Sequence, residues 1–267
     1  NTLTPQQNMG DGLMMALSAG ADDTNIVTCP ILAAGARDKA MDSHIGAAGV
    51  QPGAIWINKT GRRFANEGTA ENIGDIGPLY GKQPDGIVWS VLDQANIDRL
   101  AENGSEISIG EFVVFGRPLD RLRMELDQDV ADGVAFAANT PEELAEKIGV
   151  SPENFAATVA AYNEACAAGD DKEFFKQEKY LRPLSIPPFY AVALATGTMG
   201  SAGGIRINGN MQVVDKDYEP IPGLYAVGLD ATGLYGDSYN MEVPGAANGF
   251  AHTSGRIAGR HFAAQQA

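Results

Sequence analysis

Apolar and polar positions follow helical spacing most clearly in the middle of the chain. Residues 140–143 (TPEE) and 151–154 (SPEN) each place a hydroxyl, a proline and an acid in the order that starts a helix. The second start leads into an apolar stripe at spacings of four, three and four, formed by Phe155, Val159, Tyr162 and Cys166. The pattern predicts an amphipathic helix that ends near Gly169, with Cys166 in its core rather than acting as a reactive thiol.

The N-terminal region carries one helical pattern and then loses its periodicity. Residues 9–21 (MGDGLMMALSAGA) place Asp11 before apolar residues at helical spacing, and Gly20 follows as a stop. This predicts a short helix capped by the aspartate. Residues 22–50 are rich in Ala, Gly and Asp without firm periodicity, so we expect loops or irregular structure there.

Two segments have the β-branched and aromatic composition of buried strands. They are residues 53–58 (GAIWIN) and 86–92 (GIVWSVL). Asp93 follows the second strand and is placed to cap a helix. Residues 70–77 (AENIGDIG), by contrast, resemble a loop.

The last third alternates apolar and polar residues and then turns to small ones. Residues 203–208 (GGIRIN) and 211–215 (MQVVD) flank the dipeptide GN, which predicts a hairpin. Residues 220–230 (PIPGLYAVGLD) predict a turn followed by a buried strand. From residue 245 onward small residues dominate, which predicts a helix able to pack close to another backbone.

Composition and charge narrow the classes of function. The chain has 267 residues, of which 44% are hydrophobic and 20% charged, as in a globular enzyme. Its formal charge of −15 should repel phosphate backbones and anionic lipid, so no nucleic-acid partner is expected. No apolar run is long enough to predict a membrane span. Since the first residue is Asn rather than Met, we expect an excised piece of a longer chain.

Cysteine and histidine do not form a recognisable ligand pattern. Cys29 and Cys166 lie far apart and lack a CxxC partner, and the three histidines show no metal-ligand spacing. No metal site is therefore predicted. Cys29 before Pro30 is either redox-active or, more simply, a buried structural cysteine.

Five blocks in fixed order resemble a known family. They are GAIWINKTGRRFANE, FAATVAAYNEACAAGDD, TMGSAGGIRIN, PIPGLYAVG and SGRIAG. Together they resemble the flavoprotein family of fumarate reductases, succinate dehydrogenases, urocanate reductases and ketosteroid dehydrogenases, over nearly the whole chain.

The resemblance implies an α+β chain made of parts of two domains. Residues 1–50 would be the end of the first FAD-domain segment with a linker, residues 51–195 the cap or substrate domain, and residues 196–267 the C-terminal segment of the FAD-binding domain. The family's N-terminal Rossmann unit has a GxGxxG turn that holds the FAD pyrophosphate, and no GxGxxG occurs here. We therefore expect an incomplete α/β FAD-binding domain, and FAD to be present in the full-length parent but absent from this fragment.

The resemblance also implies which residues approach the flavin. The segment GLYAVGLD includes Gly228, and the family acid after its second glycine is replaced by Leu229, with Asp230 one position later. Gly203 and Gly204 are expected on one side of the flavin. Backbone amides near the ring carbonyl edge would come from the Gly-rich match, namely Gly245, Ala246, Ala247 and Asn248. Plain turn and helix packing is the alternative for each glycine.

The family's charged substrate residues are missing. In fumarate reductases an arginine four residues after the "NE" glutamate donates a proton, and that position holds Glu71. The substrate-binding histidines fall on Cys29 and near Gly197, and the C-terminal arginine falls on Tyr239 or Glu242. Since Glu71 would repel a dicarboxylate, the substrate is not expected to be fumarate or succinate.

Tyrosines offer a neutral alternative. Ketosteroid dehydrogenases of this family use tyrosine hydroxyls, and Tyr239, helped by Tyr235, is our first candidate for donating a proton or hydrogen bond to an enone-like or aromatic substrate. Both tyrosines could instead only pack. Glu71 is either a general acid, if burial raises its pKa, or a solvated carboxylate. Arg63 is expected to pair with Glu67 and fix this corner of the chain, with Arg62 solvated.

Two classes of function follow. The first is part of a flavin-dependent reductase or dehydrogenase that transfers hydride between FAD and a small organic substrate, with the isolated chain inactive. The second is a non-catalytic ligand-binding or structural module derived from such an enzyme. Relatives are often exported and receive electrons from cytochromes or quinols, so an electron-donor protein or a quinol is a partner to consider.

Overall fold

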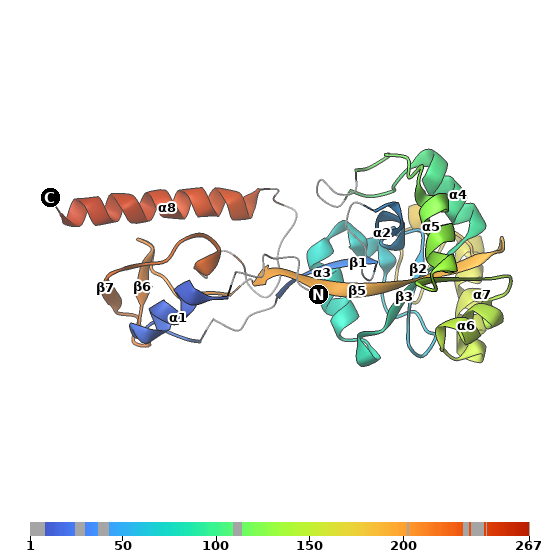
Figure 1. Cartoon of the computed structure of the whole chain (residues 1–267), viewed down its shortest axis with the longest axis horizontal. Coiled ribbons are helices and arrows are strands. Elements are labelled where there is room, and N and C mark those ends of the chain that lie inside the picture. Colours follow the sequence, from blue (N-terminus) through green and yellow to red (C-terminus); the bar gives the residue numbers. More distant parts are fainter. Residues whose placement is uncertain are drawn as a thin grey trace. The chain divides into compact units, whose positions relative to one another are not determined.

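The structure is a computed structural model that describes residues 9–24, 30–36, 43–108, 114–201, 203–231, 235, 243 and 245–266. It divides into two compact units (Figure 1). The small unit comprises residues 1–32 and 197–267, and the large unit comprises residues 33–196. The domain boundaries expected after residues 50 and 195 refer to a longer protein and stay a prediction. Within the described residues, no helix combines the length and apolarity needed to cross a membrane.

A five-stranded sheet organises the large unit, in the order β1-β5-β3-β2 with β4 also pairing β5. Its strands are β1 (Pro30–Ala36), β2 (Ile55–Asn58), β3 (Val88–Asp93), β4 (Ala135–Ala138) and β5 (Phe189–Ser201). The predicted strands at 53–58 and 86–92 are confirmed as β2 and β3, which pair antiparallel with Trp56 opposite Ser90. Both strands are almost fully buried, as their composition predicted.

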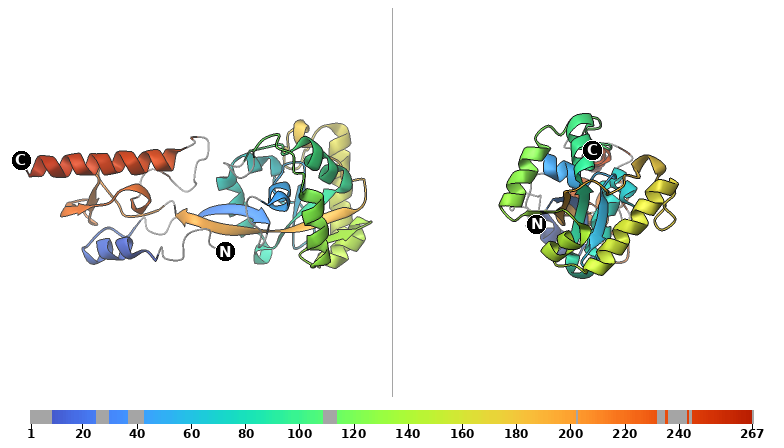
Figure 2. Two further views of the ribbon diagram at one scale, coloured as in Figure 1. Left: turned by 45° about the horizontal axis from the view of Figure 1, so that its top comes forward. Right: turned by 90° about the vertical axis from the view of Figure 1, so that its right-hand side faces the viewer.

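Helices cover both sides of this sheet, as the right-hand view in Figure 2 shows. They are α2 (His44–Gly49), α3 (Ile73–Gly81), α4 (Gln94–Asn103), α5 (Leu122–Ala131), α6 (Pro141–Ile148) and α7 (Pro152–Ala168). Short 3-10 turns lie at Glu67–Glu71 (η1), Pro84–Gly86 (η2) and Glu178–Tyr180 (η3). α6 and α7 pack on one face, where Ile55, Ile57 and Phe155 share a core.

The predicted helix caps of the large unit are confirmed. The side chains of Asp93, Thr140 and Ser151 each accept a hydrogen bond from a backbone N–H of the helix that follows. Gly169 ends α7 in the left-handed conformation. Cys166 lies partly buried against the core of the same helix, as its place on the apolar stripe predicted.

Two segments expected to be irregular contain helices or strands in their described residues. Residues 22–50 contain β1 and α2, because β1 pairs with β5 and the Ser43 side chain accepts a hydrogen bond from Gly46 N at the start of α2. Residues 70–77 were expected to be a loop, but they complete η1 and begin α3. In both cases tertiary packing outweighs weak local propensity.

The small unit holds α1 (Asp11–Ser18), β6 (Gln212–Val214), β7 (Pro220–Tyr225), the turn η4 (Gly228–Asp230) and α8 (Ala246–Gln265). α1 confirms the first predicted helix, but its N-cap is Gly10, without a side-chain cap bond, and Asp11 lies in the first turn. The carboxylate still suits that turn, since a negative charge stabilises a helix N-terminus.

The predicted hairpin is confirmed, and the expected burial of the following strand is wrong. Asn208 N donates to Gln212 O at 3.0 Å across the turn. The strand β7, expected to be buried, has three exposed and three partly buried residues. Along α8 only Ser254 is buried. As its small residues predicted, this helix approaches another backbone closely at Gly228, where a Cβ would lie 3.7 Å from Ala251 Cα, whereas a Cβ built on Gly249, Gly255 or Gly259 meets no described atom within 4 Å.

Candidate functional site

The corner RRFANEGTAE begins with a buried ion pair. The Arg63 guanidinium donates from Nε to Glu67 Oε1 at 3.0 Å and from Nη2 to Glu67 Oε2 at 2.7 Å, which confirms the predicted pairing. Its Nη2 also donates to Asp171 Oδ2 at 2.9 Å. Arg62 is exposed, as expected. The 63–67 turn is therefore fixed by a bidentate pair, the strongest geometry for such contacts.

Lys176 completes this group, which we call the buried charge cluster: Arg63, Glu67, Asp171 and Lys176. The Lys176 ammonium lies 3.3 Å from Glu67 Oε2 and donates to Ala54 O at 2.8 Å. Burial alone would raise the pKa of the Glu67 carboxyl, but the cations of Lys176 and Arg63 reverse this and lower it. Two cations and two carboxylates thus balance each other away from water.

Glu71 ends the same corner in a different environment. Its Oε1 lies 3.3 Å from Lys179 Nζ and accepts a hydrogen bond from the Tyr180 hydroxyl. The side chain is 49% exposed, so the prediction of exposure is confirmed. The Tyr180 hydrogen bond lowers the pKa of the Glu71 carboxyl. General-acid catalysis by Glu71 required a raised pKa, so these surroundings favour the ionised, solvated alternative.

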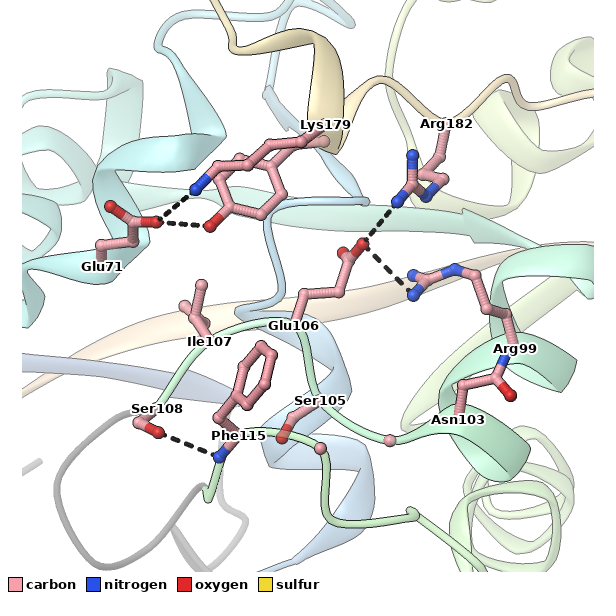
Figure 3. A pocket seen from close by; sticks show the side chains of 13 residues that line it. Glu71, Arg99, Asn103, Ser105, Glu106, Ile107, Ser108, Phe115, Lys179 and Arg182 are labelled. Carbon is pink, nitrogen blue, oxygen red and sulfur yellow. Dashed lines mark hydrogen bonds and ion pairs between the residues drawn. The ribbon is translucent and has the colours of Figure 1, made fainter.

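Glu71, Lys179 and Tyr180 lie at the edge of an open pocket of about 930 Å³, which we call the Glu71 pocket (Figure 3). All of its lining residues belong to the large unit. Besides these three, it is lined by Arg99, Asn103, Gly104, Ser105, Glu106, Ile107, Ser108, Phe115, Gly116 and Arg182.

A carboxylate shared by two arginines forms the other end of the pocket. Glu106 Oε1 lies 3.2 Å from Arg99 Nη1 and 3.1 Å from Arg182 Nη2. Glu106 Oε2 accepts from Gly53 N at 3.0 Å. The buried Gln51 side chain accepts from Glu106 N at 2.6 Å and so holds this loop against the strand β2 region. Sequence patterns gave no signal for this end, since its members are far apart along the chain.

Four of the expected flavin residues meet in the small unit. A Cβ on Gly204 would lie 2.6 Å from Asp230 O, and the neighbouring Ile205 N donates to that oxygen at 2.8 Å. Gly228 has a left-handed φ of 61°, and its N–H donates to Ser254 Oγ of α8 at 3.0 Å. Gly203 directly precedes Gly204, where the chain passes close to the Asp230 backbone. Close backbone packing therefore already accounts for the small size of Gly204.

The expected flavin residues Gly245, Ala246, Ala247 and Asn248 form the start of α8. Gly245 is the N-cap with a left-handed φ of 79° and no side-chain cap bond. A Cβ there would meet no described atom within 4 Å. A helix start without a side-chain cap leaves backbone N–H groups for an outside acceptor, and small residues let a ligand approach that backbone. On these two observations the small unit fits FAD.

Some predicted residues lie outside the described chain. Cys29, Tyr239 and Glu242 are among them, so Tyr239 stays a prediction. Tyr235 is described and half-buried in the small unit. In the described part of the chain, no group of three or more His, Cys, Asp or Glu side chains is arranged to hold a metal ion.

Comparison with known proteins places these features in a family. Vinyl phenol reductase of Lactiplantibacillus plantarum is 35% identical over 263 residues, covering 95% of this chain and 53% of the relative. A probable fumarate reductase of Shewanella frigidimarina is 30% identical over 254 residues, covering 95% of this chain and 38% of the relative. The chain thus spans about half, or less, of the length of these relatives.

Solved structures agree on the fold. The 3-ketosteroid Δ1-dehydrogenase from Sterolibacterium denitrificans, in complex with 1,4-androstadiene-3,17-dione, superposes with a TM-score of 0.75 at 23% identity, covering 99% of this chain and 48% of that one. The open conformation of a flavocytochrome c3 fumarate reductase gives 0.56 at 27% identity, covering 94% and 39%. A family model described as the FAD binding domain matches residues 1–244. The chain therefore belongs to the FAD binding domain family.

Proposed function

We propose that this chain is part of a flavin-dependent oxidoreductase that transfers hydride between FAD and a small organic substrate with a C=C bond or an enone, other than fumarate or succinate. One observation carries the exclusion of dicarboxylates. At the position where the resemblance places a proton-donating arginine stands Glu71, whose pKa is lowered, and it already neutralises the nearby Lys179. A second carboxylate from a substrate would meet like charge there.

The cap domain of this enzyme would be residues 51–195, and residues 196–267 would complete its FAD-binding domain after a Rossmann unit supplied elsewhere in the parent. Gly203, Gly204, Gly228 and Asp230 would lie beside the flavin. The N-terminal amides of α8 would face its carbonyl edge, as the uncapped start at Gly245 supports. When bound, FAD supplies the hydride chemistry at N5.

Tyrosine would supply the proton or hydrogen bond. Tyr239, with Tyr235 near it in sequence, is the proposed donor, and the named activities of relatives such as vinyl phenol reductase and 3-oxosteroid 1-dehydrogenase are consistent with a substrate other than a dicarboxylate. In the intact enzyme, Tyr239→Phe is expected to lower kcat by about two orders of magnitude or more while flavin stays bound. Unchanged turnover would rule out Tyr239.

The deciding experiment uses the full-length parent. Flavin absorbance of the purified protein is expected, together with turnover of a neutral enone such as 2-cyclohexenone and none of fumarate. The isolated chain is expected to be colourless. Measurable fumarate reduction would contradict the proposal, and a colourless full-length protein would instead support a non-catalytic module.

A further inference from the structure

The two ends of the Glu71 pocket carry different net charge. At one end Lys179 and Glu71 form a single pair that cancels. At the other end Arg99 and Arg182 both contact one carboxylate, Glu106, so two cations share a single direct ion-pair partner. Figure 3 shows Glu71 and Lys179 on one side of the pocket and the arginine group on the other.

Glu106 offers a single negative charge to the two arginines. Its Oε1 is taken by both guanidinium groups, and its Oε2 accepts from Gly53 N at 3.0 Å. Arg182 is 33% exposed and Arg99 is 22% exposed, while Glu106 is only 9% exposed. The cations therefore reach further toward solvent than the carboxylate they share.

The two neighbouring cations disfavour each other. Burial lowers the pKa of Arg99 and the neighbouring Arg182 cation lowers it further, although the carboxylates of Glu106 and Asp93 oppose this. Two like charges in a partly desolvated place are relieved by an anion that contacts both. The chain as a whole carries −15, so a locally cationic pocket is against its average surface charge.

Apolar side chains lie between the two ends. Ile107 is buried and Phe115 is 70% exposed, and both line the pocket. An exposed aromatic ring beside paired cations suits a ligand with an apolar body. We propose that the Glu71 pocket binds an organic monoanion, with its anionic group at Arg182 and Arg99 and its uncharged body along Phe115 toward the Glu71 end.

The same geometry disfavours dianions. A second anionic group at the far end would meet the ionised Glu71, whose nearby cation is already paired. The inference rests on the proposed function only in taking this ligand to be the substrate. Binding itself needs no flavin, so it can be measured on this chain alone.

A matched set of probes tests the charge class. Benzoate, benzamide and terephthalate share a ring and differ in carrying one, no and two carboxylates. By calorimetry on the 267-residue chain, benzoate is expected to bind about tenfold more tightly than either of the others. Its affinity should fall as salt rises, while that of benzamide should not. Equal affinities for benzoate and benzamide, or no binding of benzoate at millimolar concentration, would overturn the proposal.

Three variants locate the anion. Arg182→Gln is expected to weaken benzoate binding about tenfold, whereas Arg62→Gln, the same charge change at an exposed residue bonded only to Asn154 among its described contacts, should leave it unchanged. Glu71→Gln should raise the affinity for terephthalate several-fold and not that for benzamide. Equal losses in R182Q and R62Q, or no gain in E71Q, would contradict the assignment.

The two proposals fail separately. If the chain does not bind benzoate while the full-length parent reduces a neutral enone with bound flavin, only the monoanion pocket is wrong. If the chain binds benzoate while the parent carries no flavin, only the proposed redox function is wrong.

Discussion

One short segment makes the same kind of contact in two environments. Arg63 and Glu67 pair with Asp171 and Lys176 out of contact with water, while Glu71, one turn later, pairs with Lys179 at the open edge of the pocket. Both sets of partners come from residues 171–180. The buried contacts therefore hold segments 63–71 and 171–180 together. The exposed Glu71 instead sets the charge at the edge of the pocket.

The sharpest test compares the two glutamates. Glu67→Gln leaves two buried cations facing only Asp171, so it is expected to lower the free energy of unfolding by about 3–5 kcal/mol. Glu71→Gln removes a half-exposed pair and should cost less than about 1 kcal/mol. Urea unfolding followed by tryptophan fluorescence measures both, since Trp56 and Trp89 lie in the large unit. Similar costs for the two variants would contradict the comparison.

Acid should remove the stability that the ionised Asp171 adds to the buried charge cluster. Burial opposes ionisation of Asp171, but its hydrogen bond from Arg63 lowers the pKa below the ordinary 3.8. A carboxylate with a lowered folded pKa adds stability above 3.8, and this is lost as pH falls through the folded value.

The variant Asp171→Asn isolates this contribution. It is expected to cost about 1.5–3 kcal/mol at neutral pH, because hydrogen bonds to charged groups are lost. The difference in unfolding free energy between wild type and variant should be constant from neutral pH down to about 5 and shrink below 4, measured by urea unfolding at each pH. A difference that stays constant in acid would show that the Asp171 charge adds nothing.

Local signals predicted the parts of the fold that local chemistry decides. Caps at Asp93, Thr140 and Ser151 rest on one side chain and the helix that follows it, so a short stretch of sequence is enough. The strand β1 rests on pairing with β5 across most of the chain, and no window of sequence holds that information. The strand β7 differs from expectation because three of its six residues are exposed, whereas α8 approaches the backbone at Gly228 closely, as its small residues predicted.

The candidate site also combines a contact that the sequence predicted with contacts that only the folded chain shows. The pairing of Arg63 with Glu67 spans one turn and was predicted from the resemblance of this corner to the family. Asp171 and Lys176 join them from 108 and 109 residues further along, and only the folded chain brings them there. The sequence placed Glu71 correctly in an exposed position, yet its partners Lys179 and Tyr180, and the whole arginine end of the pocket, required the tertiary structure.

The smallest expected effect concerns Phe175. It lies in the segment 171–180, which supplies the partners of both the buried charge cluster and Glu71. Phe175 lies directly before the buried Lys176, has a left-handed φ of 57° and is 78% exposed. Its carbonyl accepts from Asn66 Nδ2 at 3.0 Å, so the backbone, rather than the ring, makes the useful contact. A left-handed backbone costs a residue with a Cβ about 1–2 kcal/mol, and glycine avoids that cost.

Phe175→Gly is therefore expected to raise the free energy of unfolding by about 0.5–1 kcal/mol, after the entropy that glycine adds to the unfolded chain is subtracted. Phe175→Ala is the matched control, since it removes the exposed ring but keeps the Cβ and hence the strain. Urea unfolding followed by tryptophan fluorescence should rank glycine above wild type, and alanine at or below it. If glycine and alanine gave the same stability, the exposed ring and not the backbone would decide this position, and the register between the two segments would not depend on a strained turn.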